Sequence, residues 1–331
     1  MILITGHLDS RASDVMDFTG DAPGANDDAS GVAAVMEAAR VLSRHKFRAT
    51  LVYGVLSGEE QGLYGGNILA EYARAQGWQV QAVINNDIIG NSRGADGVHD
   101  NSTVRVFSEG SQRRDGGEVD APSRNIARFM ATLAQRYLTN LRVQMVYRSD
   151  RVGRAGDQMA FLELGYPAVR VTEAHEDYRH QHQDPRVENG VTYGDTIEFV
   201  DFDYLAQVTR LNLVTLAALA NAPAPPRGVG IAGAVTPHTT LTWRTQPAVA
   251  GYRVWWRATS APHWQYQRFV AADAAPTGRL VLENLVIDDW FFGVSAVSAD
   301  GYESPVVFPG APGAFWPESP AAEKDDGDRR N

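Results

Sequence analysis

Residues 57–66 read SGEEQGLYGG and place two adjacent glutamates, Glu59 and Glu60, in a glycine-rich loop. The run before them, residues 50–56 (TLVYGVL), is rich in residue types that favour a β-strand. An amphipathic stretch that predicts a helix over residues 63–76 follows. Adjacent carboxylates at the end of a strand repel each other unless a positive group lies nearby, and a metal ion is the usual solution. The alternative is a pair of solvated loop acids.

The composition limits the classes of function. A chain of 331 residues has room for two domains, and 44% hydrophobic with 21% charged residues is ordinary for a globular protein. The net charge of -10 argues against nucleic acid as a partner. No apolar run is long enough to span a membrane. There are no cysteines, so any zinc must be held by His, Asp and Glu.

Two further strands are predicted to end in side chains that can bind metal. Residues 1–6 form an apolar run followed by His7 and Asp9, and residues 80–86 form another followed by Asp87. The carboxyl ends of parallel strands are where sites are built in open sheets. His7 could bind a metal while Asp9 orients the site or holds the opposite ring nitrogen. Asp87 is either a cap or a ligand.

A glycine- and aspartate-rich loop ends in PGANDDASG, residues 23–31. Ser30 is a plausible N-cap for a helix whose apolar residues recur to position 42. Asp27 and Asp28 then have two interpretations. They stabilise the helix dipole, or one of them bridges two metal ions just before the helix begins.

Three of the eight histidines fall within residues 173–184, an acidic run that follows a predicted buried strand over 166–172. They are His175, His180 and His182. A histidine cluster in such a loop is a candidate metal site.

Strand and helix patterns alternate through the first two-thirds of the chain. Further strands are predicted over 103–108 and 141–147, and further helices over 123–138 and 202–220. This alternation favours a three-layer α/β/α sandwich with a mostly parallel sheet, which we assign to residues 1–221.

The pattern changes after a Pro-rich linker at residues 222–228 (APAPPRG). Short alternating runs then predict a small all-β sandwich over residues 229–310. Trp243 early and FGVSAV at 292–297 late resemble a fibronectin type III domain. Its aromatic residues suit core packing or a protein or carbohydrate partner. Residues 311–331 are predicted to be a disordered acidic tail.

Five signatures of the first domain, taken in this order, resemble the zinc aminopeptidases of family M28. They are GHLDS at 6–10, PGANDDASG at 23–31, SGEEQG at 57–62, NDIIG at 86–90 and HQHQD at 180–184. The resemblance covers residues 1–220 and implies the phosphorylase/hydrolase-like fold of zinc peptidases. It also implies two zinc ions per chain.

The resemblance assigns metal ligands residue by residue. His7 and Asp87 match the terminal ligands of one zinc, and Glu60 and His180 match those of the other. Asp27 matches the carboxylate that bridges the two ions.

The resemblance also implies the reaction. Glu59 matches the general base that takes a proton from a metal-bridged water, and Asp9 matches a residue that supports the site. The substrate would be a peptide with a free N-terminus, held by the site acids. A carboxypeptidase, a glutaminyl cyclase and a non-catalytic binding protein with a vestigial site are the alternatives.

The sequence departs from the family in several places. Gln158 follows Asp157 where the family usually has His, and His182 is an alternative ligand. His180 is preferred because its four-residue spacing to Asp184 matches the family. The chain also begins six residues before His7, so a truncated N-terminus or a sheet short of an edge is expected.

The family and the appended β-sandwich suggest a periplasmic or secreted protein. The pocket walls are expected to come from loops such as 91–121 and 148–156, which leaves the preferred N-terminal residue open.

Overall fold

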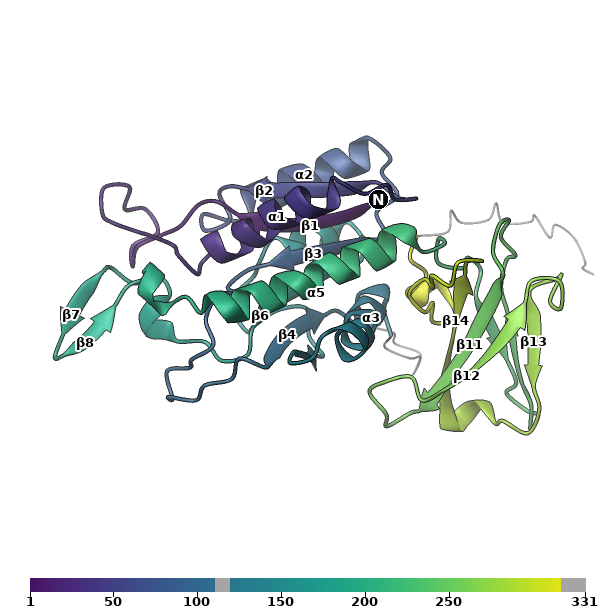
Figure 1. The fold of residues 1–331 in the computed structure, drawn as a ribbon. Coiled ribbons are helices and arrows are strands. Elements are labelled where there is room, and N and C mark those ends of the chain that lie inside the picture. The colour runs from purple at the N-terminus through teal and green to yellow at the C-terminus, as the bar shows by residue number, and fades with distance from the viewer. Residues whose placement is uncertain (111–119, 317–331) are drawn as a thin grey trace, which may run out of the picture.

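The computed structural model describes residues 1–110 and 120–316 of the chain, and its elements divide into an α/β part and an all-β part (Figure 1). The strands of the α/β part are β1 (Ile2–His7), β2 (Leu51–Leu56), β3 (Ala82–Asn86), β4 (Thr103–Ser108), β5 (Arg142–Val146), β6 (Ala168–Glu173), β7 (Arg186–Glu188) and β8 (Val191–Tyr193). Its α-helices are α1 (Ala29–Leu42), α2 (Tyr64–Ala75), α3 (Pro122–Tyr137), α4 (Gln158–Glu163) and α5 (Phe202–Asn221). Two short 3-10 turns, η1 (Tyr178–His180) and η2 (Ile197–Phe199), lie before β7 and before α5.

One six-stranded sheet, in the order β2-β1-β3-β6-β4-β5, organises the described α/β part. The strands β2, β1, β3 and β6 are parallel. β4 runs antiparallel to β6, and β5 is parallel to β4. The predicted mostly parallel sheet is therefore confirmed.

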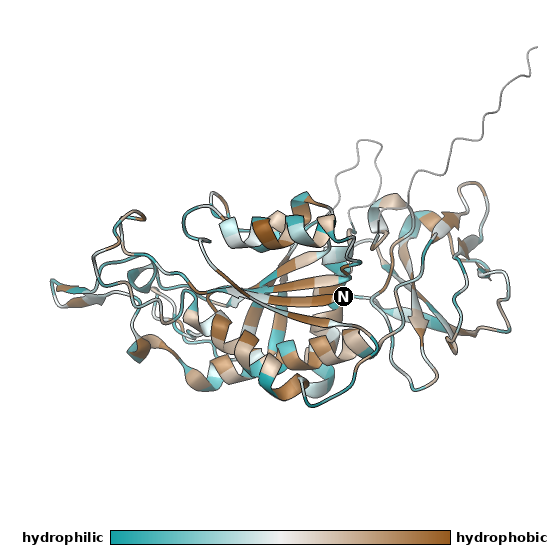
Figure 2. Ribbon diagram, turned by 90° about the horizontal axis from the view of Figure 1, so that it is seen from above, coloured by the Kyte–Doolittle hydropathy of each residue, from teal (hydrophilic) through white to brown (hydrophobic). Residues whose placement is uncertain are grey.

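Helices cover both faces of this sheet, as the view from above shows (Figure 2). Side chains alternate along β1, so that Ile2 and Ile4 pack in one buried cluster with residues of α1, α3 and α5. Leu3 belongs to a second cluster with residues of α2 and α4. The three-layer α/β/α architecture expected from the sequence follows from this alternation, because the central strands β1, β3 and β6 are buried on both sides.

The start of α1 differs from the prediction. Asp28, not Ser30, is the N-cap, and its side chain accepts a hydrogen bond from the backbone N–H of Gly31. Ser30 lies inside the first turn, where its hydroxyl donates to the carbonyl of Asn26. The capping interpretation is therefore right for Asp28, and it leaves Asp27 free for another role.

The all-β part contains two three-stranded antiparallel sheets, β13-β10-β9 and β12-β11-β14. Their strands are β9 (Gly230–Ala232), β10 (Thr239–Thr242), β11 (Gly251–Ala258), β12 (Tyr266–Ala271), β13 (Arg279–Leu282) and β14 (Trp290–Val297), with 3-10 turns η3 (Ile287–Asp289) and η4 (Ala311–Gly313). Trp243 and Tyr252 pack together in its core. The resemblance to a fibronectin type III domain, and the domain boundaries themselves, stay predictions.

The prediction that disorder begins at residue 311 is wrong for the first part of that segment. Residues 311–316 are described, η4 lies within them, and Phe315 is 2% exposed in the core. The Arg227 guanidinium lies over the Trp316 ring. Residues 317–331 lie outside the described residues.

The two parts share a buried interface. One cluster of apolar side chains runs from Leu216 of α5 to Phe292 of β14. Beside it, the carboxylate of Asp120 lies 3.0 Å from Arg128 of α3 and 2.7 Å from Arg257 of β11. All three side chains are buried, so this Arg–Asp–Arg group connects the parts without access to water.

We expect Asp120→Ala to destabilise the protein by about 3–5 kcal/mol, because it leaves two buried guanidinium groups without a carboxylate partner among the described residues. The free energy of unfolding from urea titrations followed by fluorescence measures this. Arg48→Ala is the matched control, since the Arg48–Asp300 pair joins the same two parts but is half exposed. Equal effects of the two variants would contradict a structural role for the buried group.

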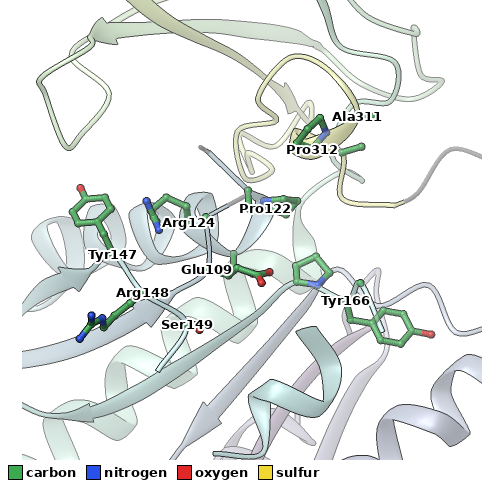
Figure 3. A pocket seen from close by; sticks show the side chains of 15 residues that line it. Glu109, Pro122, Arg124, Tyr147, Arg148, Ser149, Tyr166, Ala311 and Pro312 are labelled. Atoms are coloured by element: carbon green, nitrogen blue, oxygen red, sulfur yellow. The ribbon is translucent and has the colours of Figure 1, made fainter. Parts of the chain in front are cut away.

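A cavity of about 790 Å³ lies at the junction of the two parts (Figure 3). Glu109, Arg124 and Tyr147 line it from the α/β side, and Ala311 and Pro312 line it from the other. The guanidinium of Arg124 lies 4.4 Å from the centre of the Tyr147 ring and donates hydrogen bonds to Ser108.

Among the described residues, no helix is long and apolar enough to cross a membrane.

Candidate metal centre

The candidate site forms where parallel strands end together. His7 is the last residue of β1 and lies opposite Leu56, the last residue of β2. Asp87 directly follows β3, the other neighbour of β1. Glu59, the first glutamate of the Glu-Glu loop (residues 57–62), lies three residues after the end of β2. Three chain segments therefore deliver polar side chains to one edge of the sheet.

Two groups of metal-ligating side chains meet at this edge. The first consists of His7, Glu59 and Asp87, and its candidate ligand atoms lie within 4.8 Å of one another. The second, with the same spacing, consists of Asp27, Glu60 and His182. The structure therefore places five of the seven residues singled out from the sequence in these groups, together with one that was kept only as an alternative.

Asp27 belongs to the second group, and its carboxylate also faces the first group. Its Oδ1 is 3.2 Å from Nε2 of His7, and its Oδ2 is 3.1 Å from Nε2 of His182. A carboxylate with one oxygen toward each group has the position of a bridging ligand, which is the arrangement that the sequence predicted for Asp27.

The preference for His180 over His182 is wrong in this structure. His180 stacks on Phe199, with ring centroids 3.5 Å apart, and its Nδ1 is 3.0 Å from the carbonyl of Gly194. The turn η1 ends at His180, and His182 has a φ of 52°. This change of direction brings Nε2 of His182 to 3.2 Å from Glu60. Spacing along the chain could not reveal it.

Asp9 supports the Glu-Glu loop as well as the ring of His7. Its carboxylate accepts hydrogen bonds from the backbone N–H groups of Gly58, Glu59 and Glu60, at 2.8, 3.3 and 3.1 Å. The Nδ1 atom of His7 lies 2.9 Å from the backbone carbonyl of Asp9 and 3.7 Å from its carboxylate. Asp9 therefore fixes both the loop and the ring.

Asp28 and Asp195 position the backbone around Asp27. Asp28 accepts backbone hydrogen bonds from His7, Gly31 and Ile88, and so joins three segments at the site. Asp195 accepts one from the backbone N–H of Asp27 at 2.7 Å. No pattern in the sequence pointed to Asp195, which follows a glycine in an irregular loop.

Arg170 is a second residue that the sequence analysis missed. It is 0% exposed within β6, and its guanidinium lies 2.7 Å from Asp87 and 3.5 Å from Asp150. A lone arginine in the apolar run YPAVRVT was the available signal. Gln158 donates to the carboxylate of Asp150 at 2.6 Å.

The electrostatics of the site favour a cation. Burial and the nearby charge of Asp87 raise the pKa of Glu59 to about 9. Burial, with Asp87 again, raises the pKa of Asp157 to about 7. Burial alone would lower the pKa of His7, but its hydrogen bond to Asp27 and the surrounding carboxylates raise it to about 12. Buried acids in excess of cations hold protons unless a metal ion replaces them.

The residues present fit zinc. The Oε1 atom of Glu60 is buried and has no hydrogen-bond partner among the described residues. Unpaired buried polar atoms are costly, and a metal ion would satisfy them. Each group offers imidazole nitrogen and carboxylate oxygen, which are zinc ligands at sites without cysteine. Each group could therefore hold one ion, with Asp27 between them.

Both groups of candidate ligands therefore lie at the carboxyl edge of a mainly parallel sheet. The model of peptidase family M28 matches residues 1–191, and the chain belongs to this family. A protein of Pyrenophora tritici-repentis described as a probable zinc metalloprotease is 45% identical over 323 residues, covering 93% of this chain and 66% of that protein. A protein of Pyricularia oryzae with the same description is 42% identical, covering 93% and 64%.

The chain thus spans about two-thirds of the length of these curated relatives. Among solved structures, the LapA aminopeptidase of Legionella pneumophila matches with a TM-score of 0.51 and 23% identity, over 67% of this chain and 51% of that one. At this identity the likeness supports the fold.

Proposed function

We propose that the protein is a zinc-dependent aminopeptidase that removes N-terminal residues from peptides. The observation that carries the proposal is the position of Asp27 between two groups that each hold a histidine and a glutamate. Membership of family M28 supports peptide-bond hydrolysis.

The ions would be held by His7, Asp87 and Asp27 on one side and by Asp27, Glu60 and His182 on the other. Zinc bound there would act as a Lewis acid toward the scissile carbonyl and lower the pKa of a water molecule.

Glu59 would move the proton. It lies in the group of His7 and Asp87, whereas Glu60 lies in the other group. Asp9 holds the backbone N–H groups of both glutamates and so keeps the loop in this conformation. The carboxylate of Glu59 would accept a proton from the attacking water and deliver it to the leaving amine. The loop would thus give its two neighbouring glutamates different tasks, one in proton transfer and one in metal binding.

The site acids would also select the end of the substrate. A cavity of about 280 Å³ opens above the two groups and is lined by Asp27, Glu59, Glu60 and Asp87. A protonated α-amine would be favoured beside such carboxylates, whereas an internal peptide bond offers no charge there. Two complete ligand groups favour this reaction over that of a cyclase with one zinc.

The first test measures the number of zinc ions bound per chain after zinc loading and removal of excess metal. The second measures the hydrolysis of leucine p-nitroanilide. We expect close to two zinc ions and hydrolysis that a chelator abolishes. N-acetyl-leucine p-nitroanilide is the matched control and should not be cleaved, because it has no free amine. Cleavage of both substrates, or one zinc with no cleavage, would overturn the proposal.

A further inference from the structure

The cavity above the metal-ligating groups has a cationic wall. Three arginines line it together with the acids, namely Arg11, Arg151 and Arg154. The remaining described lining residues are glycines, an alanine, His182 and Leu63, so Leu63 is the one large apolar side chain among them. A pocket that selects an apolar residue is lined mainly by apolar side chains. The lining of this cavity is mainly charged instead.

The arginines outnumber the carboxylates that neutralise them. Glu176 alone pairs with Arg105 at 2.6 Å, with Arg151 at 3.3 Å and with Arg154 at 3.1 Å. These three guanidinium groups hold the pKa of Glu176 at about 2, against the effect of its burial. Asp150 pairs with Arg151 but also faces the buried Arg170. Positive charge therefore remains at the cavity wall.

Part of each guanidinium fork is also free. The hydrogen bonds of Arg154 to Glu176 and Gln181 both come from Nη1. Those of Arg151 come from Nε and Nη1. Among the described residues, Nη2 of both arginines and Nε of Arg154 have no hydrogen-bond partner. Arg154 is held in place by its bonded nitrogen while its other donors can bind a ligand.

We propose that Arg151 and Arg154 bind a carboxylate of the substrate. The proposal rests on the proposed function, because it places that carboxylate in the same cavity as the peptide. Arginine presents paired N–H donors that match the two oxygens of a carboxylate. The carboxylate has two sources, namely an acidic N-terminal side chain and the C-terminus of a short peptide.

The first arm compares glutamate p-nitroanilide with glutamine p-nitroanilide, which have the same shape and differ in charge. We expect a preference for glutamate of about 10-fold or more in kcat/KM, the size of a charge-assisted hydrogen bond. The second arm compares Leu-Gly with Leu-Gly amide, which differ in the C-terminal charge. A preference in either arm supports the proposal and identifies the source.

Arg154→Met should remove the preference, and Arg154→Lys should keep part of it. Arg148→Met is the matched control, because Arg148 lies in the same loop but lines the cavity at the junction of the two parts (Figure 3). It should leave the preference unchanged. Zinc content and circular dichroism establish that each variant is folded.

Failure of this inference and failure of the proposed function give different results. Hydrolysis of leucine p-nitroanilide with no preference in either arm would overturn the carboxylate site and leave the aminopeptidase intact. If no aminoacyl substrate is cleaved, calorimetry of the zinc-loaded protein with L-glutamate and L-glutamine decides the matter. Equal binding of the two amino acids, or tighter glutamate binding that survives Arg154→Met, would overturn the inference.

Discussion

Glu59→Gln is expected to lower kcat by roughly 100-fold or more while two zinc ions per chain remain bound. Glutamine has nearly the same shape as glutamate but cannot accept and return a proton. Glu59 is 9% exposed, so no bulk water easily replaces it in that task. The measurement is kcat with leucine p-nitroanilide beside zinc content by elemental analysis.

The neighbouring variant Glu60→Gln is the matched control. Glu60 lies 3.2 Å from His182, on the side of Asp27, so its change should weaken metal binding and lower the zinc content. Loss of one zinc from Glu59→Gln instead would show that Glu59 is a ligand beside His7 and Asp87. A loss of activity of only a few-fold would contradict the general-base role.

The protonation of Glu59 links this prediction to the metal. In the metal-free protein its pKa of about 9 keeps a proton on the carboxyl group at neutral pH. A base must lose that proton, and nearby divalent cations favour the charged carboxylate. We therefore attribute the raised pKa to the uncompensated site, and under the proposed function Glu59 would become a base once the ligand groups held their ions.

Much of the site was predictable because parallel strands end at the same edge of a sheet. The apolar runs before His7 and Asp87 identify β1 and β3 from the sequence, and the residue after a buried strand then has a defined place. Glu59 and Glu60 follow β2 in the same way. The strand patterns therefore placed these residues at strand ends, and the resemblance to family M28 assigned their roles.

Side chains in irregular segments were less accessible to sequence reasoning. His180 and His182 are two residues apart, and the choice between them depends on the direction of the backbone after η1. Asp195 acts through a backbone N–H of a residue 168 positions away. Such contacts follow from tertiary packing, so residue spacing could not decide them.

Arg151 and Arg154 illustrate the same limit at the substrate side. The loop 148–156 was expected to contribute to the pocket, and it does so. The sequence did not reveal that its arginines converge with Arg105 on Glu176, because that convergence joins β4, this loop and the loop after β6.

His182→Ala is expected to reduce the zinc content from two ions to one and to lower kcat/KM by roughly 100-fold or more. A catalytic ion contributes several kcal/mol of charge stabilisation in the transition state, and each 1.4 kcal/mol is about tenfold in rate. The Nε2 atom of His182 lies within 3.2 Å of both Asp27 and Glu60, so no other described histidine can take its place without movement of the loop.

His180→Ala separates this role from a general effect of the loop. Its ring stacks on Phe199, so the variant should lose packing and about 1 kcal/mol of stability while keeping both zinc ions. Zinc content, kcat/KM and the urea midpoint, measured for both variants, distinguish the two positions. Loss of zinc from His180→Ala but not from His182→Ala would restore the ligand chosen by sequence spacing, and it would require η1 to rearrange when the metal binds.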